Sequence, residues 1–344
     1  MTNKERIKRA FSNQPVDRVP IAFFHHFTSP YEWNMGLTNP EALEANINRH
    51  KTSLEKFVPD IIKIMNDTLM MMPLDVSGIE KASDLYKIKK PMLDTPYAKA
   101  QIDFTKRVMG IYKGIDAPIY VTCFSAAWVL RNAFTQGLPV FGADEEIMQR
   151  FIKEDPVAVK YALDILTEGI IDLNRVLLTE CGADGIYFSC NNQGGFFNEV
   201  FHKKYLAPAE KKVLDEAKKI KNTNILHICG YHGHGNDLRL YKTYDAAAYS
   251  VAVVAEDTSL KEAKKLFKGK CIIGGFSQDG VIYKGSKEDL ENATYGLLSE
   301  CGQTGIILGA DCTVPNDIDE ERFNWIRESC KKYASCNSVI SSAS

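Results

Sequence analysis

The chain has 344 residues, with 42 Lys and Arg residues against 44 Asp and Glu residues, and 45% of its residues are hydrophobic. This balance excludes a strongly charged surface, so we expect no nucleic-acid partner. No segment approaches the roughly 18 apolar residues of a membrane span, and the first residues lack the apolar core of a secretory signal. The sequence therefore predicts a cytoplasmic protein without a membrane partner. Its 9 cysteines are an odd number for a disulfide framework and indicate buried thiols or metal ligands.

Short apolar segments bounded by Gly, Asp or Asn alternate along the chain with longer segments of helical period. This alternation is typical of βα units and a parallel sheet. The segments with the pattern of strands are residues 20–26, 60–66, 118–124, 184–190, 224–229, 246–251, 271–275 and 305–310. Strands that are each followed by a helix predict a single (β/α)8 barrel of the TIM type over residues 1–336. We expect residues 337–344 to form a disordered tail.

Several helix starts are recognisable. Asn39 and Asp155 each stand before a proline, which places a capping side chain ahead of a proline in the first turn. Ser259 opens a capping box, and Ser286 opens a weaker one. Residues 68–116 contain three prolines and are too long for one helix, so they predict a flap or extra helices between the second and third strands.

The strongest chemical signal lies at the ends of two predicted strands. Barrel active sites lie at the carboxyl ends of the strands. His227 and Cys229 are two positions apart on the fifth strand, so their side chains point to the same side, and Cys312 follows the eighth strand. Imidazole nitrogen and thiolate sulfur are preferred ligands of zinc. Three ligands with a fourth position open are typical of catalytic rather than structural zinc sites.

Other thiols and imidazoles compete for this role. His232 and His234 follow Cys229 in a glycine-rich loop, where a solvated, non-ligating role is the alternative. Cys123 and Cys190 end the third and fourth strands, and small buried apolar side chains are the alternative for both.

Polar residues at the remaining strand ends are candidates for the pocket. His25 and His26 end the first strand, and alternation allows only one of them to face the barrel mouth, where it can orient a substrate or donate a proton. We count His25, His26 and Asp311 as candidate catalytic residues. Asn66, Asn191 and Gln278 are candidate cofactor-binding residues, and Asp67, Asn192 and Gln193 are further polar groups at strand ends.

Taken in order, several segments resemble the uroporphyrinogen decarboxylase superfamily over nearly the whole chain. They are residues 5–6, 15–20, 181–186, 226–230, 272–275 and 309–315. The superfamily includes metal-free decarboxylases of uroporphyrinogen and zinc methyltransferases that move a methyl group from a corrinoid protein to a thiol such as coenzyme M. The decarboxylases carry an arginine-rich segment after the first strand, which binds the substrate's carboxylates, whereas residues 23–29 here contain no arginine. His227, Cys229 and Cys312 match the zinc motif of the methyltransferases.

The resemblance therefore implies a zinc-dependent methyltransferase that transfers a methyl group from a methylated corrinoid protein to a thiol bound as a zinc thiolate. The chain has no Asp-x-His-x-x-Gly corrinoid signature, so we expect the corrinoid (cobalamin) on a partner protein. Coenzyme M, homocysteine, another thiol or a folate remain open as the acceptor, as does the oligomeric state. The alternatives are a uroporphyrinogen decarboxylase and a non-catalytic barrel that binds a tetrapyrrole.

One position departs from the family pattern. The methyltransferases place a carboxylate near the end of the sixth strand as a displaceable fourth ligand, whereas this chain has Ser250 there. Glu256 and Asp257 follow a few residues later. The sequence leaves open whether one of these carboxylates or water fills the fourth position.

Overall fold

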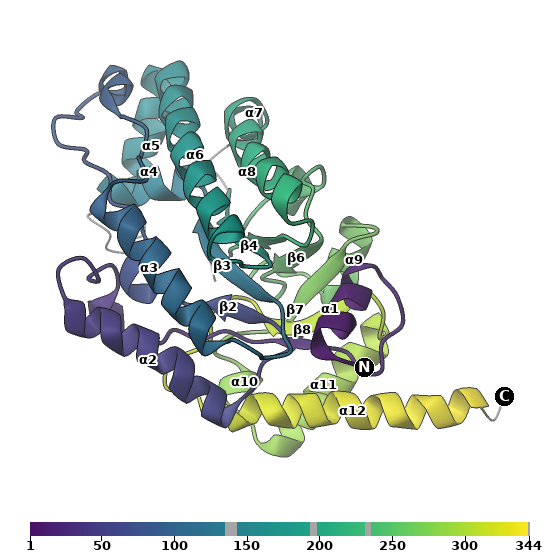
Figure 1. Cartoon of the computed structure of the whole chain (residues 1–344). Helices are drawn as coiled ribbons and strands as arrows, with labels where there is room; N and C mark the ends of the chain where they lie inside the picture. Colours follow the sequence, from purple (N-terminus) through teal and green to yellow (C-terminus); the bar gives the residue numbers. More distant parts are fainter. Residues whose placement is uncertain (135–142, 193–197, 231–234, 343–344) are drawn as a thin grey trace.

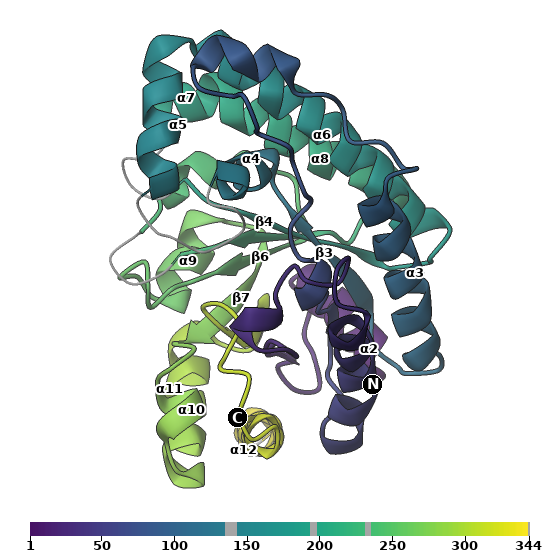
Figure 2. The same cartoon turned by 90° about the vertical axis from the view of Figure 1, so that its left-hand side faces the viewer.

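Eight parallel strands form one sheet that curls into a nearly closed barrel in the computed structural model, which describes residues 1–134, 143–192, 198–230 and 235–342 (Figures 1 and 2). The order β1-β8-β7-β6-β5-β4-β3-β2 follows the chain around the barrel. The predicted (β/α)8 fold is confirmed. The strands are β1 (Ile21–Ala22), β2 (Ile62–Ile64), β3 (Ile119–Phe124), β4 (Gly185–Cys190), β5 (Ile225–Ile228), β6 (Ala248–Val251), β7 (Cys271–Phe276) and β8 (Ile306–Ala310).

Helices connect the strands and surround the sheet. Figure 1 shows α6 and α8 running side by side above the strands, and α11 and α12 pack against each other below them. No described helix is both long enough and apolar enough to cross a membrane. The α-helices are α1 (Asn3–Phe11), α2 (Pro40–Lys56), α3 (Pro96–Ile111), α4 (Ala126–Phe134), α5 (Ala143–Glu154), α6 (Pro156–Thr179), α7 (Glu199–Phe201), α8 (Ala207–Ile220), α9 (Leu260–Leu266), α10 (Val281–Lys284), α11 (Lys287–Cys301) and α12 (Glu321–Ser342).

The predicted helix starts are confirmed. The Asn39 side chain accepts a hydrogen bond from the backbone N–H of Ala42 at 3.1 Å, and Asp155 caps α6 in the same way. Ser259 and Ser286 both form complete capping boxes. These caps satisfy N–H groups that the first helical turn leaves without partners.

The apolar core has two layers, as a barrel requires. The outer layer lies between the strands and the helices, and a smaller cluster fills the barrel interior. Ile7, Ala10 and Phe11 of α1 belong to the inner cluster together with Tyr120 and Ile307. The N-terminal helix therefore adds apolar side chains to the interior of the barrel.

Among the described residues, β1 and β2 share no ladder of backbone hydrogen bonds. Side chains connect these two strands instead. The guanidinium of Arg18 forms a buried ion pair with Asp60 at 2.6 Å. Asp60 also accepts a hydrogen bond from the backbone N–H of Ile21 at 3.0 Å. A carboxylate thus takes the place of a backbone acceptor at the start of β1.

Three regions add detail to the sequence-based expectations. Strands β1 and β2 are shorter than predicted, because the chain leaves the ladder after Ala22 and Ile64. Residues 68–116 contain extra helices, one of the two predicted alternatives: the 3-10 helices η2 (Asp67–Leu69) and η3 (Ala82–Lys87) precede α3, and η3 packs against α6. The expected tail 337–344 begins within α12, which continues to Ser342.

Further short turns complete the connections. They are the 3-10 helices η1 (Pro30–Glu32) and η5 (Leu238–Tyr241) and the π-helical turn η4 (His202–Leu206). The first of them follows β1 at the carboxyl end of the barrel, where Pro30 lines a cavity.

Candidate metal centre

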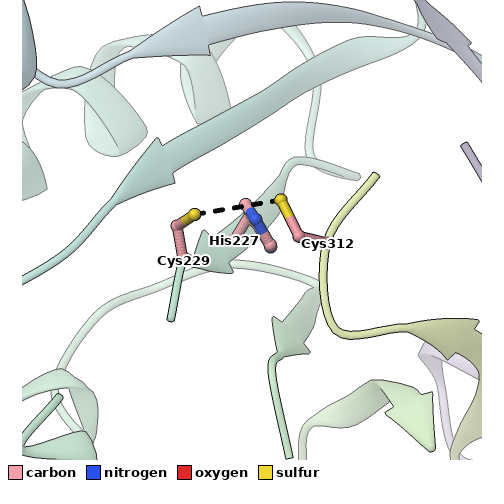
Figure 3. Close-up of side chains that lie close together, drawn as sticks. All are labelled: His227, Cys229 and Cys312. Atoms are coloured by element: carbon pink, nitrogen blue, oxygen red, sulfur yellow. Dashed lines mark hydrogen bonds between the residues drawn. The ribbon is translucent and has the colours of Figure 1, made fainter. Parts of the chain in front are cut away.

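Three potential metal-binding side chains meet where β5 and β8 end (Figure 3). His227 lies on β5, Cys229 follows that strand directly, and Cys312 lies two residues after β8. One ligand atom of each residue lies within 4.8 Å of the others. The two sulfur atoms are 3.9 Å apart. The barrel therefore brings together the three residues that the sequence singled out.

The spacing of these atoms fits a zinc ion. Tetrahedral zinc with Zn–S bonds of about 2.3 Å separates two sulfur ligands by about 3.8 Å. The observed separation is 3.9 Å. His227 and Cys229 are only 4% and 7% exposed, so bulk water does not compete for their donor atoms. One nitrogen and two sulfurs leave the fourth tetrahedral position open.

The imidazole of His227 is held by the neighbouring strands. Its Nδ1 atom lies 3.1 Å from Ser250 Oγ, and that hydroxyl lies 2.9 Å from the hydroxyl of Tyr187. Ser250 on β6 is the register partner of His227. Because Nδ1 is occupied by this contact, Nε2 is left for a metal. Ser250 thus supports a donor residue instead of supplying a carboxylate.

The two thiols have unequal proton affinities. The pKa of Cys312 lies well below its ordinary value, because Cys229 donates a hydrogen bond to it and because His227 and Lys63 favour its thiolate against the effect of burial. The pKa of Cys229 is raised by that same hydrogen bond and by burial. One thiolate therefore forms readily in this pair, and a bound cation would favour the second.

The two carboxylates proposed for the fourth position, Glu256 and Asp257, lie outside the cluster of donor atoms. Both carboxylate oxygens of Glu256 lie 2.6 Å from nitrogen atoms of Asn236, which donate to them. Asn236 Nδ2 also donates to the carbonyl of Cys229 at 2.9 Å, so Glu256 acts on the end of β5 through Asn236. Asp257 is exposed, and neither carboxylate belongs to the cluster of donor atoms.

Among the rival thiols and imidazoles, Cys123 and Cys190 are buried and also lie outside the cluster. Asn174 donates a hydrogen bond to Cys123 at 3.1 Å. His232, His234 and Gln193 lie outside the described residues.

A cavity of about 480 Å³ opens beside the three donor residues. Four of the predicted polar pocket residues line it: His26, Asn66, Asp67 and Gln278. The carbonyl oxygen of the Gln278 side chain is buried without a hydrogen-bond partner among the described residues, so it is available to a ligand. The remaining lining residues include Trp33, Lys63, Asp67, Phe124, Trp128, Arg131, Tyr187 and Thr313.

Three predicted site residues do not line this cavity, and their expected roles are corrected. His25 Nε2 pairs with Glu320 at 2.9 Å, whereas His26 lines the cavity. This agrees with the expectation that only one of two consecutive histidines faces the mouth. The carboxylate of Asp311 accepts hydrogen bonds from the backbone of Val254 at 3.1 Å and Ala255 at 2.8 Å, so it anchors the loop after β6.

Asn191 is the third of these residues. Its side-chain oxygen accepts a hydrogen bond from Arg131 at 3.0 Å, and the residue is 3% exposed. Arg131 itself lines the cavity, so Asn191 contributes by orienting this cation. Asn192 bonds to the loop after β5, where its side-chain oxygen accepts the backbone N–H of Asp237 at 2.9 Å.

Sequence reasoning missed Lys63, the middle residue of β2. Its ammonium lies 4.7 Å from the centre of the Tyr187 ring and 5.4 Å from that of Phe24. Burial lowers its pKa, and electrostatic interactions with Cys312, Asp67 and Cys229 oppose that effect. A lysine inside the otherwise apolar run 61–65 is a sequence signal for a cation in the barrel interior.

Fold and site together define a (β/α)8-barrel protein with a buried cluster of one histidine and two cysteines beside a cavity at the carboxyl ends of its strands. The model of the uroporphyrinogen decarboxylase (URO-D) family matches residues 72–333. The chain belongs to this family.

Similar proteins cover nearly the whole chain. A relative from Methanosarcina mazei, described as methylcobamide:CoM methyltransferase MtbA, is 24% identical over 96% of this chain and 98% of its own length. The protein of the same description from Methanosarcina acetivorans is 25% identical over the same shares. The solved structure of a methyltransferase from Methanosarcina mazei superposes with a TM-score of 0.72 at 17% identity, over 97% of this chain and 99% of that chain, which supports the fold.

Proposed function

We propose that the protein is a zinc-dependent methyltransferase, which moves a methyl group from a methylated corrinoid protein to an acceptor thiol. The observation that carries the proposal is the cluster of His227, Cys229 and Cys312, whose donor atoms lie within 4.8 Å of one another beside a cavity. The relatives described as methylcobamide:CoM methyltransferases cover 96% of the chain and support the same reaction.

The three residues would hold zinc, and the open fourth position would take the acceptor sulfur. Zinc there supplies a Lewis acid that lowers the pKa of the thiol, so that a thiolate exists at neutral pH. Ser250 fixes the His227 ring, and Asn236 fixes the backbone at Cys229. These supports keep the donor atoms in place while substrates exchange.

The cavity supplies positioning and shelter. Aromatic side chains of Trp33, Phe124 and Trp128 line it and exclude water from the sulfur. Lys63 contributes a positive charge beside the sulfur atoms. Holding the thiolate and the methyl carrier at near-attack distance is the main contribution of such a barrel to the rate. We place the corrinoid on a separate protein that docks over the barrel mouth.

The decarboxylase alternative receives less support from the cavity. Among its described lining residues, Lys63 and Arg131 are the lysine and arginine side chains, and Arg131 already donates to Asn191. A porphyrinogen with eight carboxylates would leave most of its charges unpaired there, which is costly in a buried site. A non-catalytic barrel would not require a histidine and two cysteines in ligand geometry.

Metal content tests the centre. We expect about one zinc ion per chain in protein purified without chelator, and its loss in Cys312→Ala. Cys190→Ala is the matched control, because Cys190 is another buried thiol at a strand end but lies outside the cluster. Wild type without zinc would contradict the proposal, as would equal loss of zinc in both variants.

Methyl transfer tests the reaction. Zinc-loaded protein is mixed with methylcobalamin and either coenzyme M or homocysteine, and demethylation of the cobalamin is followed by absorbance. We expect transfer in wild type and Cys190→Ala and little in Cys312→Ala. Protein that retains zinc but demethylates neither free methylcobalamin nor a methylated corrinoid protein with any thiol would refute the methyltransferase proposal.

A further inference from the structure

A chain of polar side chains connects a buried carboxylate to the candidate metal centre. Asp67 Oδ1 lies 2.9 Å from His26 Nδ1, and His26 Nε2 lies 3.1 Å from Thr313 Oγ1. Thr313 Oγ1 in turn lies 3.6 Å from Cys312 Sγ. The residues come from the ends of β1, β2 and β8, so the barrel rather than local sequence assembles the chain. All of them line the cavity.

Asp67 fixes the orientation of the His26 ring. Its second oxygen accepts hydrogen bonds from the backbone N–H groups of Phe27 at 2.5 Å and Thr28 at 3.2 Å. Burial opposes ionisation, yet the His26 contact and these two donors lower the pKa of Asp67. An ionised Asp67 accepts a hydrogen bond from the Nδ1–H group of His26, which leaves Nε2 with a lone pair directed at Thr313. Trp33 packs against the ring, with the ring centres 4.3 Å apart.

His26 is also the group in the cavity that is suited to accept a proton. Among the described lining residues, His227 and the two cysteines are the candidate ligands. Asp67 is occupied by three hydrogen bonds, and the Lys63 side chain ends over the Phe24 and Tyr187 rings, away from Thr313. The His26 side chain is 20% exposed, which gives it a route to return a proton to solvent.

We infer that His26 accepts the proton that the acceptor thiol loses, with the Thr313 hydroxyl as relay and Asp67 as the positioning residue; this rests on the proposed function. The S–H bond of the thiol breaks and its electron pair stays on sulfur. The thiol proton passes to Thr313 Oγ1 as the hydroxyl proton moves to His26 Nε2. The resulting imidazolium is paired with the Asp67 carboxylate and later releases its proton to water.

Thr313 allows the sharpest test, because valine preserves its shape and removes only the hydroxyl, whereas serine restores the hydroxyl. Wild type, Thr313→Val, Thr313→Ser and His26→Gln are prepared with cobalt in place of zinc and matched for metal content. Each is mixed with coenzyme M in a stopped-flow instrument, and the thiolate-to-cobalt absorption is recorded. This signal reports formation of the thiolate and does not depend on methyl transfer.

We expect Thr313→Val and His26→Gln to form the thiolate about 100-fold more slowly than wild type, the usual contribution of a general base. Thr313→Ser should retain most of the wild-type rate, and the final amplitudes should match. Equal rates in Thr313→Val and Thr313→Ser would overturn the relay alone. A wild-type protein that binds neither metal nor thiol would overturn the relay and the proposed function together.

Discussion

His227 Nδ1 lies 3.1 Å from Ser250 Oγ, and this contact sets which ring nitrogen faces the candidate metal centre. Ser250 is held in turn by Tyr187, whose hydroxyl is 2.9 Å away. The contact spans adjacent strands, because His227 on β5 pairs in register with Ser250 on β6. Ser250, at the position where the resemblance led us to expect a fourth ligand, therefore supports the candidate ligand His227.

We predict that Ser250→Ala lowers the affinity for zinc by about 10-fold, the lower end of the range for loss of a residue that orients a ligand. Zinc affinity is measured by competition with a chromogenic chelator. Ser189→Ala is the matched control, because Ser189 flanks His227 on β4 and also lines the cavity. Equal weakening in the two variants would show that the Ser250 hydroxyl has no special role.

Lys63 leads to a second prediction. Its ammonium is buried among aromatic rings near two sulfur atoms, where a positive charge acts through a medium of low dielectric. Lys63→Met keeps the length of the side chain and removes the charge. We expect the dissociation constant for coenzyme M to rise about 10-fold, equivalent to about 1.4 kcal/mol, with zinc retained.

Calorimetric titration of the zinc-loaded proteins with coenzyme M measures this effect. Lys203→Met serves as the control, because Lys203 is exposed and pairs with Glu199 on its own helical segment. An unchanged dissociation constant in Lys63→Met would show that the charge does not act on the bound thiolate.

The fold and the donor cluster could be predicted from the sequence. Both follow from the alternation of side chains along each strand and from the positions at which the strands end. Strand alternation places His227 and Cys229 on one side, and the closed barrel brings Cys312 to the same rim. Alternation also indicates that one of His25 and His26 faces away from the mouth, but it cannot decide which. The choice depends on Glu320, a partner far away in the sequence.

The contacts of residues just beyond the strands could not be predicted, because the alternation of side-chain directions stops at the last residue of each strand. Asp311 follows the last residue of β8, and two backbone N–H groups in the loop after β6 determine its direction. The pairing of Asp67 with His26 depends on how two connecting segments approach each other in space. Neither contact leaves a periodic signal in the sequence.

Asp311 leads to a prediction about stability. Asp311→Ala removes a charged acceptor from two backbone N–H groups in a fully buried position. We expect the free energy of unfolding to fall by about 2–4 kcal/mol, measured by urea denaturation. Asp94→Ala, at an exposed position, should change it by less than about 0.5 kcal/mol. A similar small change in Asp311→Ala would contradict the anchoring role.

A buried carboxyl group on α8 predicts how stability depends on pH. Burial raises the pKa of Glu210 to about 8 from an ordinary value of 4.5, although Tyr244 donates a hydrogen bond to it. Between these values the folded state binds a proton that the unfolded state has released. The stability that Glu210 contributes is therefore fully present below about pH 4.5 and is lost as the pH rises towards about 8.

Glu210→Gln removes this dependence while keeping an acceptor for Tyr244. We expect the variant and wild type to have similar unfolding free energies at about pH 5, with the variant more stable by a few kcal/mol at about pH 8. Denaturant titrations at intermediate pH values measure the two curves. All other titrating groups occur in both proteins, so their contributions cancel in the difference between the two unfolding free energies. If this difference did not change with pH, Glu210 would not be protonated in the folded state at neutral pH.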